Sequence, residues 1–392
     1  MKKYSFLVAI VCYMTLSSMQ CQKDGISYWP YLENYSLSGY AGDTIWVRGY
    51  NLIYDSTAER HLTINDQKVN ILSYNKDSLQ FIVPPKVGTG AIILNIGKYR
   101  PSWGPAFNYL MHAVVTTIAG TGAAGNQDGE GSSATFNYPA GIGIDDQGLL
   151  YVADCYNRSI RKISTATHQV SSYNIPADLS FENPMLLSVN RFNHIVYVSG
   201  MKRNLLSIDL PNQFKVIYDE DETITGLAAG NDNYVYASVA SENEIWRMDA
   251  AGGNKSDFKI NVSAPGALLY VWDHNRLIYS NVDSINQISI EARFAFKSAV
   301  NGAEGWGFVM DRFNNFYLAD PSCNCIQKYD PVSKTITTIA GSGKAADEDG
   351  VALLASFDHP RGITIDTEGN LYVTTYNTAT HTGNKIRKIS FE

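Results

Sequence analysis

The residues best suited to bind a ligand are aromatic and basic side chains that share one position in a repeated pattern of the chain. Trp306 lies between Gly305 and Gly307, and these glycines leave both faces of its indole ring uncovered by neighbouring side chains. Arg361 occupies the corresponding place in the next repeat. An exposed indole stacks on the apolar C–H face of a sugar ring, and a guanidinium donates paired hydrogen bonds to hydroxyl or carboxylate oxygens. The pair therefore favours a saccharide site.

Further candidates are expected beside this pair, because they occupy loops on the same face of the predicted fold. The candidate ligand-binding set is Trp306, Arg361, Tyr138, Tyr156, Arg158, His359, Tyr376 and His381. An alternative is equally open: Trp306 fills the centre of the fold as a core residue, and Arg361 pairs with an acid such as Asp358. Phe136 and Phe357 are expected to anchor loops.

Sequence signals for catalysis are weak. No H-E-x-x-H or G-x-S-x-G motif is present, and Asp145, Asp146 and Asp366 lie in turns where a structural role explains them. His359 and His381 could hold a metal together, but histidines in loops are more often solvated. We therefore expect a binding protein rather than an enzyme, with no cofactor and no bound metal.

The second part of the chain repeats itself, and this repetition decides where the candidate residues lie. The sequence T-T-I-A-G at residues 116–120 recurs at residues 337–341, and Y-V at 151–152 recurs at 372–373. Weaker copies lie between them, each with an aromatic-aliphatic strand followed by a charged strand. Six units of about 44 residues have the period of β-propeller blades. An all-β fold is therefore expected, which agrees with the high content of Tyr, Trp, Phe and Gly.

A spare strand is expected at residues 114–119, before the first unit, whereas the last unit ends after its third strand. We expect the spare strand to form the outer edge of the last blade, which closes the ring without an open edge. Two long loops, at 121–138 and 342–359, and extra residues at 376–383 then lie on one face of blades one and six. Because loops on a rigid scaffold carry most binding sites, this face is the expected ligand site.

Two segments of the repeats carry a family resemblance. Residues 139–163 contain P-A-G-I and then Y-V-A-D-C-Y-N-R-S-I-R-K-I, and the last unit has P-R-G-I at 360–363 and K-I-R-K-I at 385–389. They resemble the NHL repeat, which implies a six-bladed NHL-type propeller over residues 113–392. Some six-bladed relatives are metal-dependent lactonases or lyases, so a metal-dependent hydrolase or lyase is the alternative function. The expected ring around the central mouth contains neither an acid nor a histidine; its residues are Ala140, Met185, Thr225, Gly266, Trp306 and Arg361.

Residues 28–112 contain short alternating strands separated by Gly, Asn, Asp and Pro, a pattern typical of a small β-sandwich. The segments G-D-T-I-W-V-R-G-Y-N-L at 42–52, L-Q-F-I-V-P-P at 79–85 and G-T-G at 88–90 resemble the immunoglobulin-like IPT/TIG domain. This resemblance implies a spacer or docking module without catalysis.

The first 20 residues predict an export signal. Lys2 and Lys3 precede an apolar run at residues 6–16 that is too short to span a bilayer. The run leads to Cys21, an arrangement that resembles a bacterial lipoprotein signal and implies a lipid on this cysteine. The sequence Q-K-D at 22–24 resembles the signal that carries lipoproteins to the outer surface of some glycan-foraging Gram-negative bacteria. The alternative is simple secretion, with Cys21 as a spare thiol.

Charge and cysteine content limit the partners. The formal net charge is −7 and no basic run occurs, so nucleic acid is not expected. Beyond Cys12 and Cys21 the chain has three cysteines, an odd number that leaves at least one thiol free. The C-x-C spacing of Cys323 and Cys325 strains a disulfide and lacks the second ligand pair of a structural zinc site. Buried or loop thiols are therefore expected at Cys155, Cys323 and Cys325.

The sequence as a whole predicts a lipid-anchored protein of the outer membrane, exposed on the cell surface. The expected order is a signal peptide at 1–20, a lipidated cysteine and linker at 21–27, an IPT/TIG domain at 28–112 and the propeller at 113–392. The chain resembles accessory lipoproteins encoded beside outer-membrane glycan importers. This resemblance implies capture of a poly- or oligosaccharide by the face of blades five, six and one, with an importer as a further partner. Besides an enzyme, the alternative is a protein-docking module of the importer complex.

Overall fold

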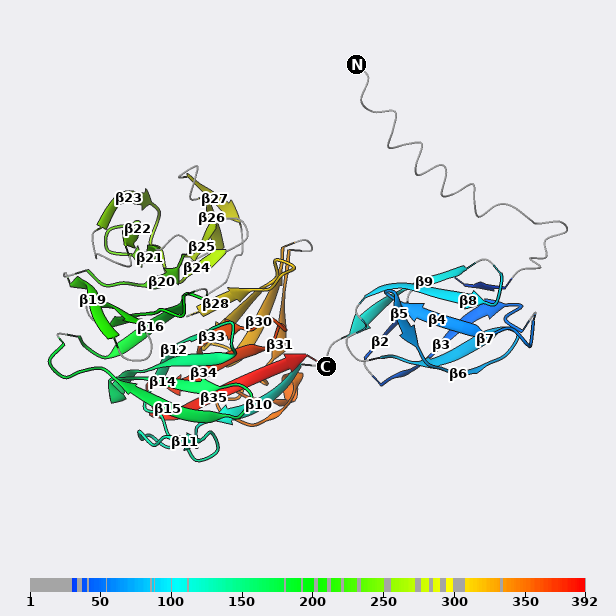
Figure 1. Ribbon diagram of the computed structural model, residues 1–392, viewed down its shortest axis with the longest axis horizontal. Coiled ribbons are helices and arrows are strands. Elements are labelled where there is room, and N and C mark those ends of the chain that lie inside the picture. Colours follow the sequence, from blue (N-terminus) through cyan, green and yellow to red (C-terminus); the bar gives the residue numbers. More distant parts are fainter. Residues whose placement is uncertain are drawn as a thin grey trace, which may run out of the picture. The chain divides into compact units, whose positions relative to one another are not determined.

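The structure is a computed structural model of the chain. It describes residues 30–33, 37–40, 42–53, 55–84, 87, 89–99, 101–110, 113–179, 181–191, 193–200, 204–209, 213–219, 222–230, 234–249, 255–271, 276–281, 285–289, 294–298, 307–331 and 334–391. The chain divides into two compact units between His112 and Ala113 (Figure 1). Both units are built from β-strands, which confirms the all-β prediction. Cys21 and Trp306 lie outside the described residues.

Helical structure is scarce in the described residues. It consists of two 3-10 turns, η1 (Cys155–Asn157) and η2 (Ala352–Leu354). In this part of the chain no helix has the length and the apolar character needed to cross a membrane.

The first unit is a β-sandwich of two sheets. Strand β3 (Thr44–Tyr50) alternates between exposed and buried positions because successive side chains point to opposite faces, so Val47 enters the core while Trp46 stays exposed. The core also contains Leu62, Phe81 and Phe107. One sheet has the order β1 (Tyr31–Leu32), β3, β7 (Ser78–Ile82), β6 (Ile71–Tyr74), and the other has the order β2 (Leu37–Tyr40), β9 (Ser102–Leu110), β8 (Gly90–Ile96), β4 (Arg60–Ile64), β5 (Gln67–Val69).

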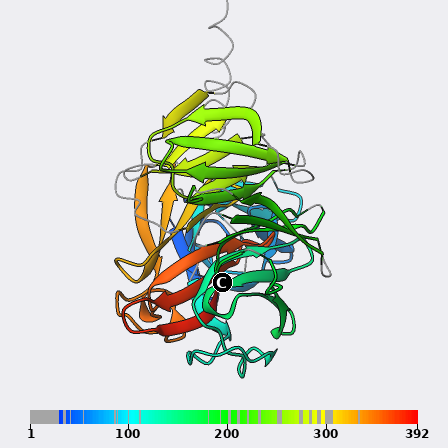
Figure 2. The same cartoon turned by 90° about the vertical axis from the view of Figure 1, so that its left-hand side faces the viewer.

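The described residues of the second unit form six sheets, which follow one another along the chain (Figures 1 and 2). The first sheet is β12 (Pro139–Ile144), β13 (Leu149–Asp154), β14 (Ser159–Ser164), β15 (Gln169–Asn174) and the short β11 (Gly129–Glu130), and the second is β16 (Pro184–Val189), β17 (Val196–Gly200), β18 (Asn204–Asp209), β19 (Gln213–Asp219). The third is β20 (Gly226–Ala229), β21 (Tyr234–Val239), β22 (Glu244–Asp249), β23 (Lys255–Asn261), and the fourth is β24 (Leu268–Val271), β25 (Arg276–Ser280), β26 (Ile285–Ser289), β27 (Phe294–Ser298). The fifth is β28 (Gly307–Met310), β29 (Phe316–Asp320), β30 (Cys325–Asp330), β31 (Thr335–Ala340), and the last is β33 (Pro360–Ile365), β34 (Leu371–Asn377), β35 (Thr382–Phe391), β10 (Ala113–Ala119) and the short β32 (Gly350–Val351).

The six sheets have a propeller-like arrangement, because they pack face to face through shared hydrophobic clusters. One cluster joins the first and second sheets and includes Ala153 and Val198. Another joins the last and first sheets and includes Tyr372 and Val152. Packing of successive sheets brings the starts of their innermost strands together around one central axis.

Strand β10 begins the second unit but lies in its last sheet. It pairs antiparallel with β35 from Ala113 opposite Phe391 to Ala119 opposite Ile386 (Figure 1). This is the partner that the sequence predicts for the spare strand. The first and last strands of the unit therefore hold each other through backbone hydrogen bonds.

A repeated turn fixes the ends of the innermost strands in three sheets. In the first sheet, Asp145 accepts two backbone N–H bonds within its own turn, and the Tyr151 hydroxyl donates to its second oxygen at 3.2 Å. The same pairs in the fifth and last sheets are Asp311 with Tyr317 at 3.2 Å and Asp366 with Tyr372 at 3.1 Å. The structural role predicted for Asp145 and Asp366 is confirmed.

A buried arginine holds the long loop of the last sheet. The Arg387 side chain is fully buried, and its guanidinium lies 2.9 Å from Asp347 Oδ1 and 2.9 Å from Asp349 Oδ1. It also donates to the backbone carbonyls of Ser356 and Glu348 at 3.0 Å each. Because both carboxylates and both carbonyls belong to the loop at 342–359, one side chain fixes the course of that loop.

The first sheet has a matching arrangement. The fully buried Arg161 guanidinium lies 2.8 Å from both Asp154 Oδ2 and Asp128 Oδ1. Phe136 and Phe357 are fully buried beside the two arginines, with guanidinium carbons 4.6 Å and 5.3 Å from their ring centroids. Both phenylalanines therefore anchor the long loops, as predicted.

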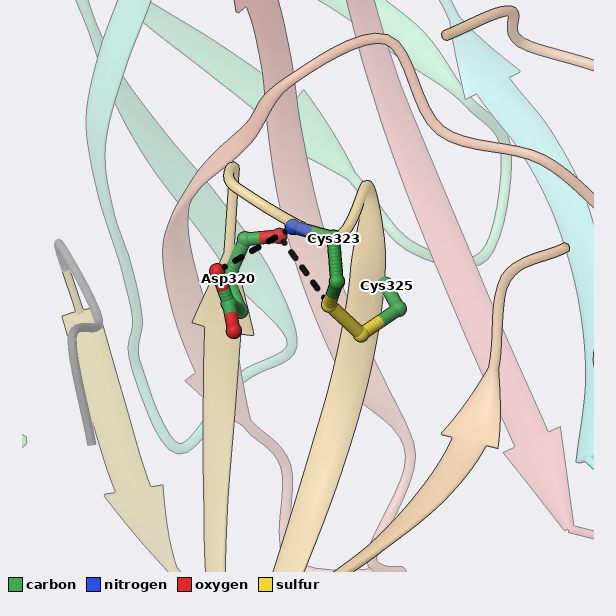
Figure 3. A group of neighbouring side chains, drawn as sticks. All are labelled: Asp320, Cys323 and Cys325. Atoms are coloured by element: carbon green, nitrogen blue, oxygen red, sulfur yellow. Dashed lines mark hydrogen bonds between the residues drawn. A yellow bond between two sulfur atoms is a disulfide. The ribbon is translucent and has the colours of Figure 1, made fainter. Parts of the chain in front are cut away.

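Cys323 and Cys325 form a disulfide in the turn between β29 and β30 (Figure 3). The prediction of two thiols was wrong. Asn324, between the cysteines, adopts a left-handed backbone conformation with φ 52°, and the sharp turn brings the two Cα atoms to 5.2 Å. That separation lies within the range of about 4.4–6.8 Å that disulfides require. Cys155 is a free, buried thiol.

The cysteine arrangement predicts a simple thiol count for the chain from Gln22 onward. Burial raises the pKa of Cys155 to about 12, so the reactive thiolate is scarce at neutral pH and the native protein should show no rapidly reacting thiol. In denaturant without reductant we expect one thiol, and after reduction three. Titration with an aromatic disulfide reagent measures these values. Three thiols in unreduced denatured protein would contradict the disulfide.

Candidate functional site

The innermost strands surround a small cavity at the face predicted to bind a ligand. Its volume is about 100 Å³. Four members of the predicted ring line it: Ala140, Met185, Thr225 and Arg361. The predicted ring also contained Gly266 and Trp306. In their blades the cavity is lined by the next residues in sequence, Ala267 and Gly307. The sequence therefore located the mouth of the fold, although Trp306 itself lies outside the described residues.

Three tyrosines of the predicted set meet beside this cavity. Tyr138 directly precedes β12, Tyr376 lies near the end of β34, and Tyr156 belongs to the η1 turn between β13 and β14. The rings of Tyr138 and Tyr376 stack with centroids 4.2 Å apart. The Tyr156 ring meets the Tyr138 ring nearly edge-on, at 5.2 Å and 67°. We call these three side chains the tyrosine cluster.

Exposure differs sharply within the tyrosine cluster. Tyr376 is fully buried and Tyr138 is 3% exposed, whereas Tyr156 is 44% exposed. The stacked pair therefore forms a rigid floor, and Tyr156 is the ring that can touch a ligand. Burial raises the pKa of Tyr138, an effect that the charge of Arg361 partly offsets, and burial raises the pKa of Tyr376 to about 12. The phenols of Tyr138 and Tyr376 therefore stay neutral at physiological pH.

The backbone of Tyr138 has a conformation that residues other than glycine rarely adopt. Its φ of 63° is left-handed although Pro139 follows, and His359 before Pro360 has the same feature with φ 56°. Its N–H donates to Asn384 Oδ1 at 3.0 Å, and its carbonyl accepts from the N–H of Cys155 at 3.0 Å. Such conformations cost about 1–3 kcal/mol and occur where surrounding structure enforces them, often at functional sites.

Arg361 joins the tyrosine cluster to the cavity. It is 7% exposed, its Nε donates to the carbonyl of Tyr376 at 2.9 Å, and its guanidinium carbon lies 5.2 Å from the Tyr138 ring centroid. The alternative partner, Asp358, accepts hydrogen bonds from Asn377 and Thr382 instead. Arg361 is thus positioned by the cluster on which it lies.

The two histidines of the predicted set have separate partners. His359 Nδ1 lies 2.9 Å from Asp358 Oδ1, and His381 Nδ1 lies 2.7 Å from the Tyr376 hydroxyl. Burial alone would raise the pKa of Asp358, but hydrogen bonds from Thr382, His359 and Asn377 lower it overall. His381 therefore lies at the edge of the tyrosine cluster, whereas His359 pairs with Asp358.

Arg158 points away from this group. Its guanidinium donates to the backbone carbonyls of Leu179 at 3.0 Å and Pro176 at 3.4 Å, in the connection to the second sheet. The structure therefore brings together Tyr138, Tyr156, Tyr376, Arg361 and His381 and leaves Arg158 in a structural role.

One group of possible metal ligands occurs among the described residues. Asp320, Cys323 and Cys325 place their ligand atoms within 4.8 Å of one another (Figure 3). The two sulfur atoms are joined in the disulfide, so they are not available as thiolate ligands. The predicted histidines, His359 and His381, are not part of such a group within the described residues.

Residues 30–109 match the family model of the IPT/TIG domain, and residues 136–163 match that of the NHL repeat. The chain carries both modules. Among proteins of known sequence, it is 24% identical over 305 residues to the protein SUPPRESSOR OF QUENCHING 1, chloroplastic, of Arabidopsis thaliana. That match covers 67% of this chain and 26% of the plant protein, so the chain spans about a quarter of the relative's length.

Solved structures share the fold over most of the chain. A structural genomics protein of Bacteroides thetaiotaomicron has a TM-score of 0.63 at 18% identity, with 93% of this chain and 98% of the other covered. A protein from the same organism described as an auxiliary nutrient binding protein has a TM-score of 0.57 at 18% identity, with 91% and 96% covered. Similarity at this level of identity establishes the fold.

A second, larger cavity lies at the other end of the innermost strands of the NHL-type unit, and sequence reasoning missed it. Its volume is about 430 Å³, and it is lined where these strands end and turn into the second strands. The charged residues of its lining are Arg191, Asp311 and Arg312. A signal was present in the sequence, because residues 190–193 and 311–314 differ only in their first residue.

Proposed function

We propose that this protein is a lipid-anchored, cell-surface binding protein that captures a poly- or oligosaccharide nutrient. The binding surface is the loop face of blades five, six and one of a six-bladed NHL-type propeller. The observation that carries this proposal is the tyrosine cluster with Arg361 beside the central mouth. An exposed phenol ring on a rigid aromatic floor, next to a cation, suits the alternating apolar and hydroxyl faces of a sugar.

The chemistry of the cluster favours a neutral or acidic glycan. Tyr156 offers a ring face for stacking, and the partly exposed His359 offers a hydrogen-bonding ring nitrogen nearby. The Arg361 guanidinium borders the cavity, where it can bond hydroxyl or carboxylate oxygens. Because the stacked Tyr138 and Tyr376 are already fixed, binding requires little ordering of side chains, which limits its entropic cost.

The role in nutrient capture is supported by the similar fold of a protein described as an auxiliary nutrient binding protein. The lipid anchor is proposed from Cys21 and the leader that precedes it. In this proposal the IPT/TIG domain serves as a spacer or docking module, and an outer-membrane glycan importer receives the captured ligand.

The proposed closed ring has a physical basis in the packing of the second unit. Each of its hydrophobic clusters is shared by two sheets, and one cluster joins the last sheet to the first. The pairing of β10 with β35 builds the last sheet from strands of both ends of the unit. A ring closed in this way has six blades and no open edge.

The test is affinity electrophoresis of the chain from Gln22 onward through gels that contain plant, fungal or mucin polysaccharides. We expect one polymer to retard the protein, and Tyr156→Ala to weaken retention about threefold to tenfold, because aromatic stacking contributes about 0.5–1.5 kcal/mol. Tyr74→Ala is the matched control, since Tyr74 is 43% exposed and lies in the first unit.

Trp306→Ala provides a second variant for the same gels. If Trp306 is part of the binding surface, retention should fall while the thermal midpoint stays nearly unchanged; a large loss of stability would assign it to the core instead. Migration unaffected by every polymer, or equal retention of Tyr156→Ala and wild type, would refute the glycan proposal. Hydrolysis of a lactone or glycan that stops on chelation would support the enzyme alternative.

A further inference from the structure

A tetrapeptide occurs twice in the second unit, and both copies border the larger cavity. Residues 190–193 read N-R-F-N and residues 311–314 read D-R-F-N. Each copy directly follows the innermost strand of its sheet, β16 in the second sheet and β28 in the fifth. The arginines of the two copies, Arg191 and Arg312, both line the cavity. In a ring of six blades the second and fifth are opposite, so the backbones of the two arginines lie on opposite sides of the cavity.

Arg191 is half-buried at this end of the fold. Its guanidinium reaches from the second sheet to the last, where it donates a hydrogen bond of 2.8 Å to the carbonyl of Ile365. Burial lowers the pKa of Arg191, and the more distant charges of Asp366 and Asp146 offset part of that effect. Within the described residues Arg191 forms no ion pair, and a backbone carbonyl does not neutralise a cation. An anion in the cavity would compensate this half-buried charge.

The acids around the cavity are held by other partners. Asp311 accepts four hydrogen bonds from its own turn and from Tyr317. Asp366 is fixed in the same way in the last sheet, and Asp146 lies 3.6 Å from His194 Nδ1. These acids are engaged by groups of the protein, so the positively charged hydrogen-bond donors that line the cavity are the guanidinium groups of Arg191 and Arg312.

The remaining lining suits a small polyhydroxylated molecule. The cavity of about 430 Å³ falls in the range of about 300–1,000 Å³ typical of small-molecule pockets. Ser188 and Thr364 contribute hydroxyl groups, and Asn314 contributes an amide. Tyr270 and Phe308 contribute aromatic surface. A ring with hydroxyl groups on its edge and apolar C–H groups on its face matches these walls.

We propose that this cavity is a second binding site, in which Arg191 and Arg312 hold the carboxylate of a monosaccharide-sized sugar acid. The guanidinium fork pairs with a carboxylate through two parallel hydrogen bonds, which gives both charge compensation and orientation. The site is independent of the proposed glycan site, because no member of the tyrosine cluster lines the larger cavity. It would bind a released acidic sugar rather than a polymer end held by the loop face.

The test uses calorimetric titration of the chain from Gln22 onward with D-galacturonate, D-galactose and inorganic phosphate as probes. We expect galacturonate to bind at least about tenfold more tightly than galactose, which has the same ring shape without the charge. Arg191→Gln and Arg312→Gln should each weaken galacturonate binding by about tenfold. Lys344→Gln is the control, because it removes one exposed charge from the same unit.

Three results would overturn the proposal. These are absence of galacturonate binding, equal affinity for galactose, and unchanged affinity in Arg312→Gln, whose exposed side chain can be replaced without disturbing the core. Phosphate binding as tight as galacturonate binding would reduce the cavity to a general anion site and refute the sugar-acid assignment. Tyr156→Ala separates the two proposed sites, because it should leave galacturonate affinity unchanged while weakening retention on polysaccharide.

Discussion

Arg387→Met is expected to lower the free energy of unfolding by about 3–5 kcal/mol, since it leaves a buried carboxylate without its partner. Arg387 is fully buried and forms ion pairs of 2.9 Å with Asp347 and Asp349. Asp347 is nearly as buried, its other hydrogen-bond donors, Thr375 and the N–H of Asp358, are neutral, and the charge of Lys385 acts on it more weakly than Arg387 does. Loss of the guanidinium also removes the bonds to the carbonyls of Ser356 and Glu348, which releases the long loop.

Equilibrium denaturation with urea measures this loss. Lys344→Met is the matched control, because the Lys344–Glu348 pair is even shorter, at 2.6 Å, but both of its side chains are exposed. Exposed pairs contribute about 0–1 kcal/mol, so the control should change little. Arg161→Met tests the equivalent position in the first sheet and should resemble Arg387→Met. If the free energy of unfolding fell by less than about 1 kcal/mol in both variants, the long loops would be stable without the buried arginines, and the prediction would be wrong.

The second large effect is a loss of stability in alkali. Burial raises the pKa of Tyr197 to about 12 and that of Tyr376 to about 12, from 10.0. Burial, reinforced by the adjacent carboxylate of Asp145, Asp311 or Asp366, also raises the pKa values of Tyr151, Tyr317 and Tyr372. These phenols ionise more readily in the unfolded chain than in the folded protein.

The sign of the effect follows from this difference. A group with a raised pKa in the folded state stabilises that state fully below its unfolded pKa and loses this contribution as the pH rises toward the folded value. For Tyr197 the window is pH 10 to about 12, and the loss is about 3 kcal/mol at most. Five buried tyrosines acting together reach the scale of the usual stability of a domain, about 5–15 kcal/mol, so cooperative unfolding is expected within this window.

Tyrosinate absorbance and circular dichroism, followed together against pH, test the alkaline effect. The two signals should change at one midpoint, because the buried phenols ionise when the protein unfolds. Replacement of Tyr151, Tyr317 and Tyr372 by Phe removes three hydrogen bonds and should lower stability near pH 7 by about 1 kcal/mol each. The same variant should lose less stability between pH 10 and 11 than wild type. Phenol ionisation that precedes unfolding would contradict this account.

The fold was accessible from the sequence because its signals are local and repeated. The alternation around Tyr151 and Tyr372, with an Asp-containing turn before each, identifies strands without any knowledge of distant contacts. The spare strand before the first unit and the third strand that ends the last one predicted the pairing of β10 with β35. The length of the repeat and the number of strands in each repeat therefore predicted most of the architecture.

The site was predicted less completely, because burial depends on contacts between distant segments. Tyr138 and Tyr376 belong to different ends of the second unit, and their stacking against each other removes both rings from solvent. The sequence alone predicted that both tyrosines bind the ligand, as it did for the exposed Tyr156. The Cys323–Cys325 disulfide was missed because it depends on the left-handed conformation of Asn324, which residue spacing does not reveal.

The pairing of β10 with β35 also governs the order in which the second unit can assemble. During synthesis or export with the N-terminus leading, β10 emerges first, but its partner strand emerges only after all the intervening sheets. Until then β10 presents an unsatisfied strand edge, which is a site for misassembly with other chains. A chaperone that binds extended segments would protect this edge, and its release would depend on the arrival of β35.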